Sequence, residues 1–410
     1  MITFEALYDN PKDALRRYES LAQNIQKGSG YPIRFFSAPG RTELGGNHTD
    51  HNNGKVLAAA VHIDIAASVL QHKERYVMFR STGYPDVYVD LSRLEPSPSE
   101  QGTTEALIRG IAAEFEAGGT PVSGWQASAN SQVPGGSGLS SSAAVEVLIG
   151  RIFDNLYGDA ARSDLEIAQI GQKAENQYFG KPSGLMDQAA CACGGLVLID
   201  FADPLQALLE TVPFDVSQAG LSLCIVRTYG NHADLTPDYA AIPYEMKAVA
   251  AFFGKTVLQE LDIQMVLASA KELSARVGDR AVLRALHFFN ENKRVEAMKE
   301  ALNQRDINRY LALVNESGDS SWELLQNVYS LSQPSSKQSI GLALALTKQF
   351  LGKSAAGACR VHGGGFAGTI QTYLPSDQAP AYREYMDALF GAGAVTELKI
   401  RRHGVVELQV

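Results

Sequence analysis

Residues 134–144, with the sequence PGGSGLSSSAA, have the composition of a phosphate-binding turn. Gly135, Gly136 and Gly138 lack a Cβ, so the backbone can adopt positive φ values and approach a ligand closely. Serines, which are favourable helix N-caps, follow, and then an apolar run typical of a helix. A glycine turn at a helix start directs backbone N–H groups and the positive end of the helix dipole to one point. The stretch predicts a phosphate cradle; an ordinary glycine-rich loop with a serine cap is the alternative.

The spacing within this stretch excludes two common nucleotide-binding motifs. No Gly-Lys-Ser/Thr sequence follows the glycines, as a P-loop requires. The third glycine of the dinucleotide fingerprint would fall inside the predicted helix. A nucleotide bound here therefore needs a different class of cradle.

Residues 40–51, GRTELGGNHTDH, form the second feature with chemical potential. Hydrogen-bonding side chains are dense in this run, which suits a polyhydroxylated ligand because each sugar hydroxyl both donates and accepts. A solvated polar turn is the alternative. The combination of Asn, His, Thr and Asp in one run favours recognition of a ligand.

Three further features carry polar groups of the right kind for catalysis. Asp187, in the run GLMDQ, can act as a general base or cap a helix. Glu175, on the preceding predicted helix, can hold Mg²⁺ or be an ordinary solvated residue. Residues 360–368 contain a second glycine turn, which is either part of a site or a tight hairpin. Together with Arg41 and the phosphate cradle, these groups are what phosphoryl transfer requires, so they predict a phosphotransferase.

The hydrophobic pattern predicts two successive α+β units that position these groups. In the first unit we expect helices at residues 3–26 (broken at Asn10-Pro11), 105–117, 141–157, 164–179 and 186–193. We expect strands at residues 33–38, 55–70, 76–79, 87–89, 125–131 and 195–201. From about residue 205 we expect a strand at 221–227 and helices at 238–253, 256–273, 279–302, 305–330 and 336–350. Strands at 356–360, 368–373 and 397–400 and a helix at 379–391 complete a split βαβ arrangement of the ferredoxin type. The ligand is expected between the two domains.

The composition is that of a soluble globular protein. Of 410 residues, 45% are hydrophobic and 20% are charged, and this length predicts two domains. The net charge of −9 argues against a nucleic-acid partner. Four cysteines are too few for a disulfide framework and are expected to be buried thiols. Neither a signal peptide nor a membrane span is apparent, so we expect a cytoplasmic protein.

Residues 40–50, 134–144, 184–188 and 360–368 resemble, in order and spacing, the motifs of the galactokinases within the GHMP small-molecule kinase superfamily. The resemblance covers nearly the whole chain. It implies an N-terminal domain like ribosomal protein S5 domain 2 over residues 1–205 and a ferredoxin-like C-terminal domain over residues 206–410. It also implies phosphorylation of the anomeric hydroxyl of a galactose-type sugar by ATP, with Mg²⁺. We expect a monomer with no nucleic-acid or membrane partner.

The resemblance also assigns roles to individual residues. Asp187 is similar to the family's catalytic carboxylate and Arg41 to its charge-stabilising partner, while Ser142 and Glu175 match the Mg²⁺ positions. The expected nucleotide cradle comprises Gly136, Ser137, Gly138, Leu139, Ser140, Ser141 and Ser142. The expected sugar-binding residues are Asn47, His48, Thr49, Asp50 and Tyr239, although the Asn and Arg-Arg that usually follow this tyrosine are here Ala240, Ile242 and Pro243.

Two departures bear on the identity of the sugar. The family tetrapeptide begins with a glutamate that accepts a hydrogen bond from the 6-hydroxyl, and Asn47 replaces it; His51 replaces the tyrosine that usually follows. Both changes are similar to those in plant galacturonate kinases. We expect galactose as the substrate with relaxed discrimination at C6, and galacturonate or another pyranose is the alternative. A catalytically silent sugar sensor is a third possibility, but such sensors lack the Ser-Ala pair, which is intact here as Ser142-Ala143.

Overall fold

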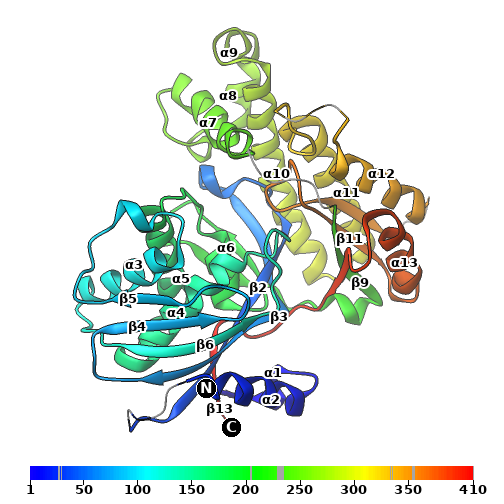
Figure 1. The fold of residues 1–410 in the computed structure, drawn as a ribbon. Helices are drawn as coiled ribbons and strands as arrows, with labels where there is room; N and C mark the ends of the chain where they lie inside the picture. Colours follow the sequence, from blue (N-terminus) through cyan, green and yellow to red (C-terminus); the bar gives the residue numbers. More distant parts are fainter. Residues whose placement is uncertain are drawn as a thin grey trace.

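The computed structural model describes residues 1–409 except 26, 27, 29, 204, 205, 229–234, 333, 335 and 353–355. Over these residues the chain forms a nine-stranded sheet and a four-stranded sheet, each with its own helices. We call the two parts the large-sheet lobe and the small-sheet lobe (Figure 1).

The large sheet is built around two long antiparallel strands, β2 (Ile33–Gly45) and β3 (Lys55–Gln71). The strand order is β1-β13-β2-β3-β6-β4-β5, and β7 and β8 extend from the other end of β3. The remaining strands are β1 (Ile2–Thr3), β4 (Tyr76–Ser81), β5 (Val87–Asp90), β6 (Trp125–Ser131), β7 (Leu196–Asp200), β8 (Leu208–Thr211) and β13 (Val406–Gln409).

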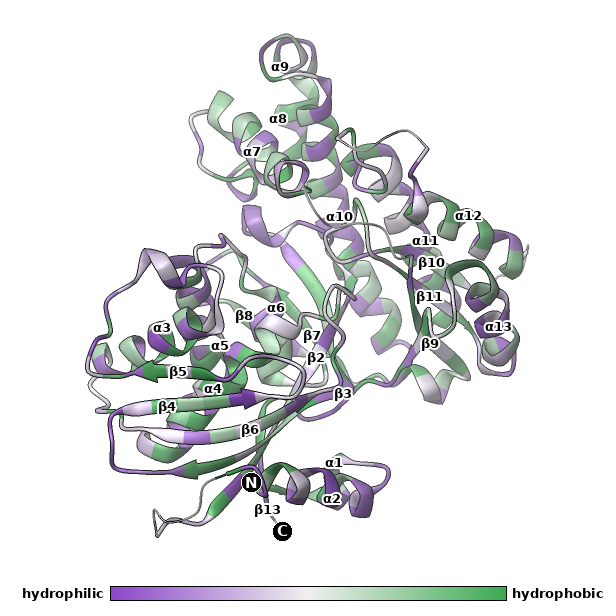
Figure 2. Ribbon diagram, in the orientation of Figure 1, coloured by the Kyte–Doolittle hydropathy of each residue, from purple (hydrophilic) through white to green (hydrophobic). Residues whose placement is uncertain are grey.

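Helices cover both faces of this sheet. On one face lie α3 (Thr104–Ala117), α4 (Ser141–Tyr157), α5 (Asp164–Ala174) and α6 (Met186–Cys193), and a π-helical turn (Glu175–Phe179) continues α5 (Figure 1). Trp125, Phe115 and Phe153 pack between sheet and helices, with ring centroids 5.6–5.8 Å apart. The short α1 (Phe4–Leu7) and α2 (Pro11–Ala22) cover the opposite face. Green segments in Figure 2 show this apolar interior.

The small sheet has the antiparallel order β10-β11-β9-β12, from β9 (Leu221–Arg227), β10 (Ala358–His362), β11 (Thr369–Pro375) and β12 (Val395–Leu398). Alternation along β9 divides the core: Leu223 and Ile225 share a cluster with α11 (Ile307–Ser320), while Cys224 and Val226 pack with α12 (Ser339–Leu351) and α13 (Ala379–Phe390). This is the two-residue period of a strand with two buried faces. The long α10 (Asp279–Asn303) joins α11 to a further layer of α7 (Thr236–Phe252), α8 (Ile263–Ala268) and α9 (Ala270–Val277).

The pattern predicted most elements and missed the short strands β1, β8 and β13; among the predicted elements, three boundaries differ most from the structure. The strand expected at 33–38 continues to Gly45, because Pro39 and Arg41 lie at a register shift where the missing proline N–H breaks no regular ladder. The helix expected at 256–273 is divided into a 3-10 turn (Leu258–Glu260), α8 and α9, since Asp262 caps a new helix start by accepting from Gln264 N. The helix expected at 305–330 ends as α-helix at Ser320 and continues as a π-helical turn (Ser321–Leu325).

The chain crosses back to the large sheet at its end. Ile400 forms a bridge with Val61, and Arg401 N donates to Ala60 O at 2.8 Å. After this crossing β13 pairs with β2 and β1. The domain boundary at residue 205 stays a prediction, and both β8 and β13, which follow it in the sequence, belong to the large sheet.

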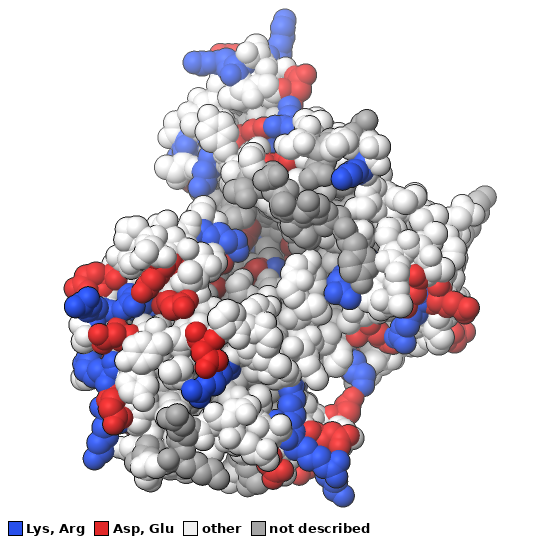
Figure 3. Space-filling view, viewed as in Figure 1, with Lys and Arg blue, Asp and Glu red and all other residues white. Residues whose placement is uncertain are grey.

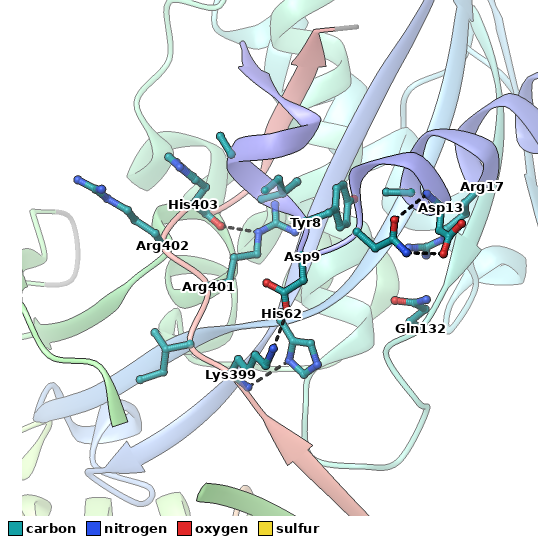
Figure 4. Close-up of a pocket in the computed structure, with 15 residues that line it drawn as sticks. Tyr8, Asp9, Asp13, Arg17, His62, Gln132, Lys399, Arg401, Arg402 and His403 are labelled. Atoms are coloured by element: carbon teal, nitrogen blue, oxygen red, sulfur yellow. Dashed lines mark hydrogen bonds and ion pairs between the residues drawn. The ribbon is translucent and has the colours of Figure 1, made fainter. Parts of the chain in front are cut away.

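A buried carboxylate fixes the crossing. Asp64, which is fully buried on β3, pairs with Arg17 of α2 at 2.7 Å and with Arg401 at 3.4 Å, and accepts from Tyr8 OH at 2.6 Å. Arg17 and Arg401 are also among the residues that line a neighbouring cavity of about 430 Å³ (Figure 4). Burial by itself would raise the pKa of the Asp64 carboxyl, but the two arginine charges hold that pKa below its usual value.

Asp64→Asn should lower the free energy of unfolding by about 3 kcal/mol at pH 7, because the buried Arg401 and the half-buried Arg17 lose their counter-charge. The folded-state pKa is depressed, so this contribution is present above the unfolded-state pKa of about 3.9 and is lost as pH falls through the folded-state value. The difference between wild type and variant should therefore shrink in acid. Urea unfolding at pH 7 and at about pH 2, well below the unfolded-state pKa, measures both effects, and a difference below about 1 kcal/mol at pH 7 would contradict the assignment.

Among the described residues, no helix combines the length and the apolar character that a bilayer crossing requires.

Candidate active site

Arg41 and Asp187 form an ion pair at the junction of β2 and α6. Arg41 Nε and Nη2 lie 2.8 and 2.7 Å from Asp187 Oδ1. The Arg41 side chain is 6% exposed and that of Asp187 is 32% exposed, so the carboxylate faces outward in front of the guanidinium. Burial alone would raise the pKa of the Asp187 carboxyl, but the Arg41 charge and the hydrogen bonds from Ser140 and Arg41 hold it below its usual value. Asp187 is therefore an ionised acceptor at neutral pH.

The glycine- and serine-rich stretch lies against the same pair. Ser140 has φ +55° and donates its hydroxyl to Asp187 Oδ2, so it supplies no side-chain cap to α4. The first backbone N–H groups of this 17-residue helix are consequently left for another acceptor. Arg41 holds the turn in place, because its Nη1 donates to Gly138 O and its backbone N donates to Leu139 O at 3.0 Å. These uncapped N–H groups fit the phosphate of a nucleotide.

Behind the start of α4 lies a cluster of buried oxygens. Gln188 Nε2 donates to Glu146 Oε2 at 2.8 Å and to Glu175 Oε2 at 2.9 Å. Lys181 Nζ is 2.9 Å from Glu175 Oε1, and its side chain is 58% exposed. Burial and the neighbouring Glu175 raise the pKa of Glu146 well above its usual value. Ser142 precedes Glu146 by four helical residues and so lies on the same face of α4.

This cluster fits a hard divalent cation. Glu146 Oε1 and Gln188 Oε1 are buried without a protein partner, and Mg²⁺ binds through oxygen. In the part of the chain that the structure describes, no group of three or more His, Cys, Asp or Glu side chains forms a ready metal site. A cation here would accordingly depend on few protein ligands together with phosphate oxygens and water, as is usual for Mg²⁺.

The predicted sugar-binding loop follows β2 and lies beside the turn before α6. Asp50 Oδ2 would be only 1.9 Å from a Cβ placed on Gly184, three residues before Asp187. His48 and Asp50 are partly exposed, whereas Asn47 and Thr49 are buried. Thr49 Oγ1 donates to backbone oxygens of Gly46 and Lys55. The structure therefore brings His48 and Asp50, but not Asn47 and Thr49, to the accessible side of the loop.

The glycine turn at residues 363–365 reaches this loop from the small sheet. His48 Nε2 donates to Gly364 O at 2.9 Å, and Tyr239 OH donates to Gly365 O at 2.9 Å. Burial lowers the pKa of His48 to about 3, so the ring is neutral and its Nδ1 remains an acceptor. On the face shown in Figure 3 the surface is hollowed between the large-sheet lobe and the helices α7–α10.

Sequence reasoning anticipated the pair Arg41–Asp187. It did not anticipate the contact of this pair with the serine-rich stretch, and it missed several supporting residues. Glu146 was not among the predicted site residues, yet it is completely buried beside the site. Asn327, whose side chain donates to Asn47 and to the glycine turn, lies in a segment without a recognisable motif. Only a charge at an otherwise apolar helix position, as in Ala-Val-Glu-Val, was a usable signal for Glu146.

Comparison with known proteins shows which kinase superfamily the chain resembles. The family model of the GHMP kinases N terminal domain matches residues 106–195. The fold superimposes on a mevalonate kinase with a TM-score of 0.61 at 13% identity, covering 90% of this chain and 99% of that one. It superimposes on Lactococcus lactis galactokinase complexed with galactose with a TM-score of 0.81 at 23% identity, covering 97% and 100% of the two chains. The fold is that of a GHMP kinase.

The sequence comparisons identify the family within this superfamily. The galactokinase galactose-binding signature matches residues 26–70. The chain is 33% identical to a galactokinase of Actinobacillus succinogenes over 88% of this chain and 90% of that one. It is also 33% identical to a galactokinase of Mannheimia succiniciproducens, over 85% and 86%. The chain belongs to the galactokinase family.

Proposed function

We propose that this protein transfers the γ-phosphoryl group of ATP to the anomeric hydroxyl of galactose, giving galactose 1-phosphate and ADP. The observation that carries the proposal is the partly exposed Asp187 carboxylate, held by Arg41 at 2.7 Å between the serine-rich turn and the sugar loop. A sugar hydroxyl bound in front of Asp187 would lie next to phosphate bound at the start of α4. This juxtaposition of acceptor and donor sites is what direct phosphoryl transfer needs.

The chain's own residues supply orientation and charge. Asp187 accepts the hydrogen bond of the anomeric hydroxyl, which aims the hydroxyl oxygen at the γ-phosphorus and draws off its proton as the new P–O bond forms. Arg41 keeps Asp187 ionised and places positive charge beside the transferring group. The N–H groups of α4 hold the phosphates that leave as part of ADP. Mg²⁺, when bound, would neutralise charge on the phosphate oxygens.

We further propose that Ser142 and Glu175 hold the Mg²⁺ of the nucleotide. The support is the cluster of oxygen groups beside Glu175 and the location of Ser142 on the same face of α4 as Glu146. In the structure Lys181 forms an ion pair with Glu175. Because the Lys181 side chain is largely exposed, it can move away from Glu175 into solvent, so a metal ion can take its place without leaving a buried unpaired charge. The monomeric state and the cytoplasmic location stay predictions.

Glu175→Gln should raise the Mg²⁺ concentration that gives half-maximal activity by about tenfold, because a neutral amide offsets less of the ion's charge. Titration calorimetry of ADP with and without Mg²⁺ provides a readout besides turnover: the metal should strengthen ADP binding less in the variant. Glu114→Gln, which removes a carboxylate that pairs with surface Lys173, is the matched control. An unchanged Mg²⁺ dependence in Glu175→Gln would remove Glu175 from the site.

The reaction itself is tested by a coupled ADP-release assay over free sugars, with the product located by ³¹P and ¹H NMR. Galactose should be phosphorylated at O1, and galacturonate and 6-deoxygalactose distinguish the C6 alternatives. Phosphorylation at another hydroxyl, or preference for galacturonate, would overturn the assignment. Absence of turnover with every sugar, while sugar still binds, would favour the silent sensor.

A further inference from the structure

Three successive carbonyl oxygens of the glycine turn accept hydrogen bonds from side chains around the predicted sugar site. The donors come from the sugar loop, from α7 and from the segment after α11, which are far apart in the sequence. The bonds are Asn47 Nδ2 to Gly363 O at 2.8 Å, His48 Nε2 and Asn327 Nδ2 to Gly364 O at 2.9 and 3.2 Å, and Tyr239 OH to Gly365 O at 2.9 Å. The turn therefore organises the sugar site from the small-sheet lobe.

Asn47 offers a sugar neither a free N–H group nor exposed surface. Its Nδ2 lies 3.1 and 3.2 Å from the two carboxylate oxygens of Glu43 and 2.8 Å from Gly363 O. Its Oδ1 accepts from Asn327 Nδ2 at 2.7 Å, and the residue is 1% exposed. Both amide groups are thus used within the protein, and essentially no surface of the side chain is open to a ligand.

Asn327 is built into the turn as closely as Asn47. It is fully buried, and its backbone oxygen accepts from Phe366 N. A Cβ on Gly365 would lie 2.2 Å from Asn327 O, so only glycine permits this approach. Gln326, at φ +59°, turns the chain so that Asn327 faces the sugar loop.

A buried ion pair lies beneath the two asparagines. Arg360 Nη2 contacts Glu43 Oε1, and the two side chains are 0% and 3% exposed. Glu43 thereby links Arg360 of the small sheet to Asn47 of the sugar loop. Because an unpaired buried charge is costly, this pair makes alternative placements of the loop unfavourable.

We propose that Asn327 is a positioning residue for the sugar, and that it acts through Asn47, which links the two lobes and makes no sugar contact. This inference rests on the proposed function. The Asn47–Asn327 pair sets the loop that carries His48 and Asp50, whose partly exposed side chains are left to meet the sugar. Discrimination at C6 therefore does not originate in Asn47.

The test is a double-mutant cycle of Asn47→Ala and Asn327→Ala. Each variant should raise the KM for galactose about tenfold, as expected for about 1.4 kcal/mol of lost interaction, and change the KM for ATP by less than twofold. The double variant should resemble the single variants, because the pair acts as a unit. Asn315→Ala is the matched control: Asn315 anchors the other end of β10 through Cys359 N and Gly357 O, and should affect the melting temperature but not KM.

A pair of substrates separates positioning from contact. The ratio of kcat/KM for galactose to that for 6-deoxygalactose should be the same in wild type and in Asn47→Ala. A ratio that collapses in Asn47→Ala but not in Asn327→Ala would show that Asn47 contacts the 6-hydroxyl, and strictly additive effects on KM would show that Asn327 does not act through Asn47. Either result overturns the proposal.

A second variant and a second readout keep the proposal testable if a protein does not fold or does not turn over galactose. If Asn327→Ala does not fold, by circular dichroism, Asn327→Leu preserves the shape of the side chain and removes its hydrogen bonds. If wild type does not phosphorylate galactose, the proposed function fails by itself. The cycle is then measured on melting temperatures, where independence of Asn47 and Asn327 would still overturn the link between the lobes.

Discussion

Asp187→Asn should lower kcat by about 10³- to 10⁴-fold with little change in the affinity for ATP. The amide keeps the shape of the side chain but cannot take the hydroxyl proton, and it leaves the Arg41 charge without its counter-charge. Stopped assays for galactose 1-phosphate measure kcat, and calorimetry measures nucleotide binding. A variant with near-wild-type turnover would remove Asp187 from catalysis.

Asp154→Asn provides the matched control. Asp154 is fully buried and, like Asp187, is paired with arginine, namely with Arg151 at 3.1 Å and Arg162 at 3.3 Å, but it lies near the far end of α4. Its substitution should cost stability without changing kcat at a temperature where the protein is folded. Comparison of the two variants separates loss of a buried ion pair from loss of the reacting carboxylate.

The parts of the site that the sequence predicted are those with a local signal. Helix α4 begins at Ser141 and ends at Tyr157 as the pattern indicated, because the serine-rich start and the apolar run are contiguous. Arg41 and Asp187 were each marked by a motif, although 146 residues separate them. Residue roles still stay predictions, since proximity of these groups shows what they can do and not which ligand they meet.

The parts that were missed depend on tertiary contacts. Asn327 is 280 residues from Asn47, and nothing near it in the sequence marks a partner. Asn47 itself lies in a motif that suggests a ligand, yet its burial follows from the approach of Glu43 and the glycine turn. The extension of β2 through Pro39 was missed because a proline usually ends a strand, and only the register shift at that residue tolerates it.

Arg41→Met should lower kcat by about 10³-fold, within the range for an arginine that stabilises phosphoryl transfer. It should also change the pH dependence. In wild type the pKa of Asp187 lies below its usual value, so activity is not limited by its protonation near neutral pH. Without the Arg41 charge, burial raises that pKa, and the acidic limb of the kcat profile moves to higher pH.

Arg41→Lys distinguishes charge from geometry. A lysine restores positive charge beside Asp187 but cannot hold Asp187 Oδ1 and Gly138 O with one planar fork. The acidic limb should return toward that of wild type while the rate stays low. Arg34→Met, on the same strand but paired with Glu407 away from the site, should leave the pH profile unchanged. If both Arg41 variants keep the wild-type acidic limb, Arg41 does not set the ionisation of Asp187, and its contribution to the rate must come from the phosphate side alone.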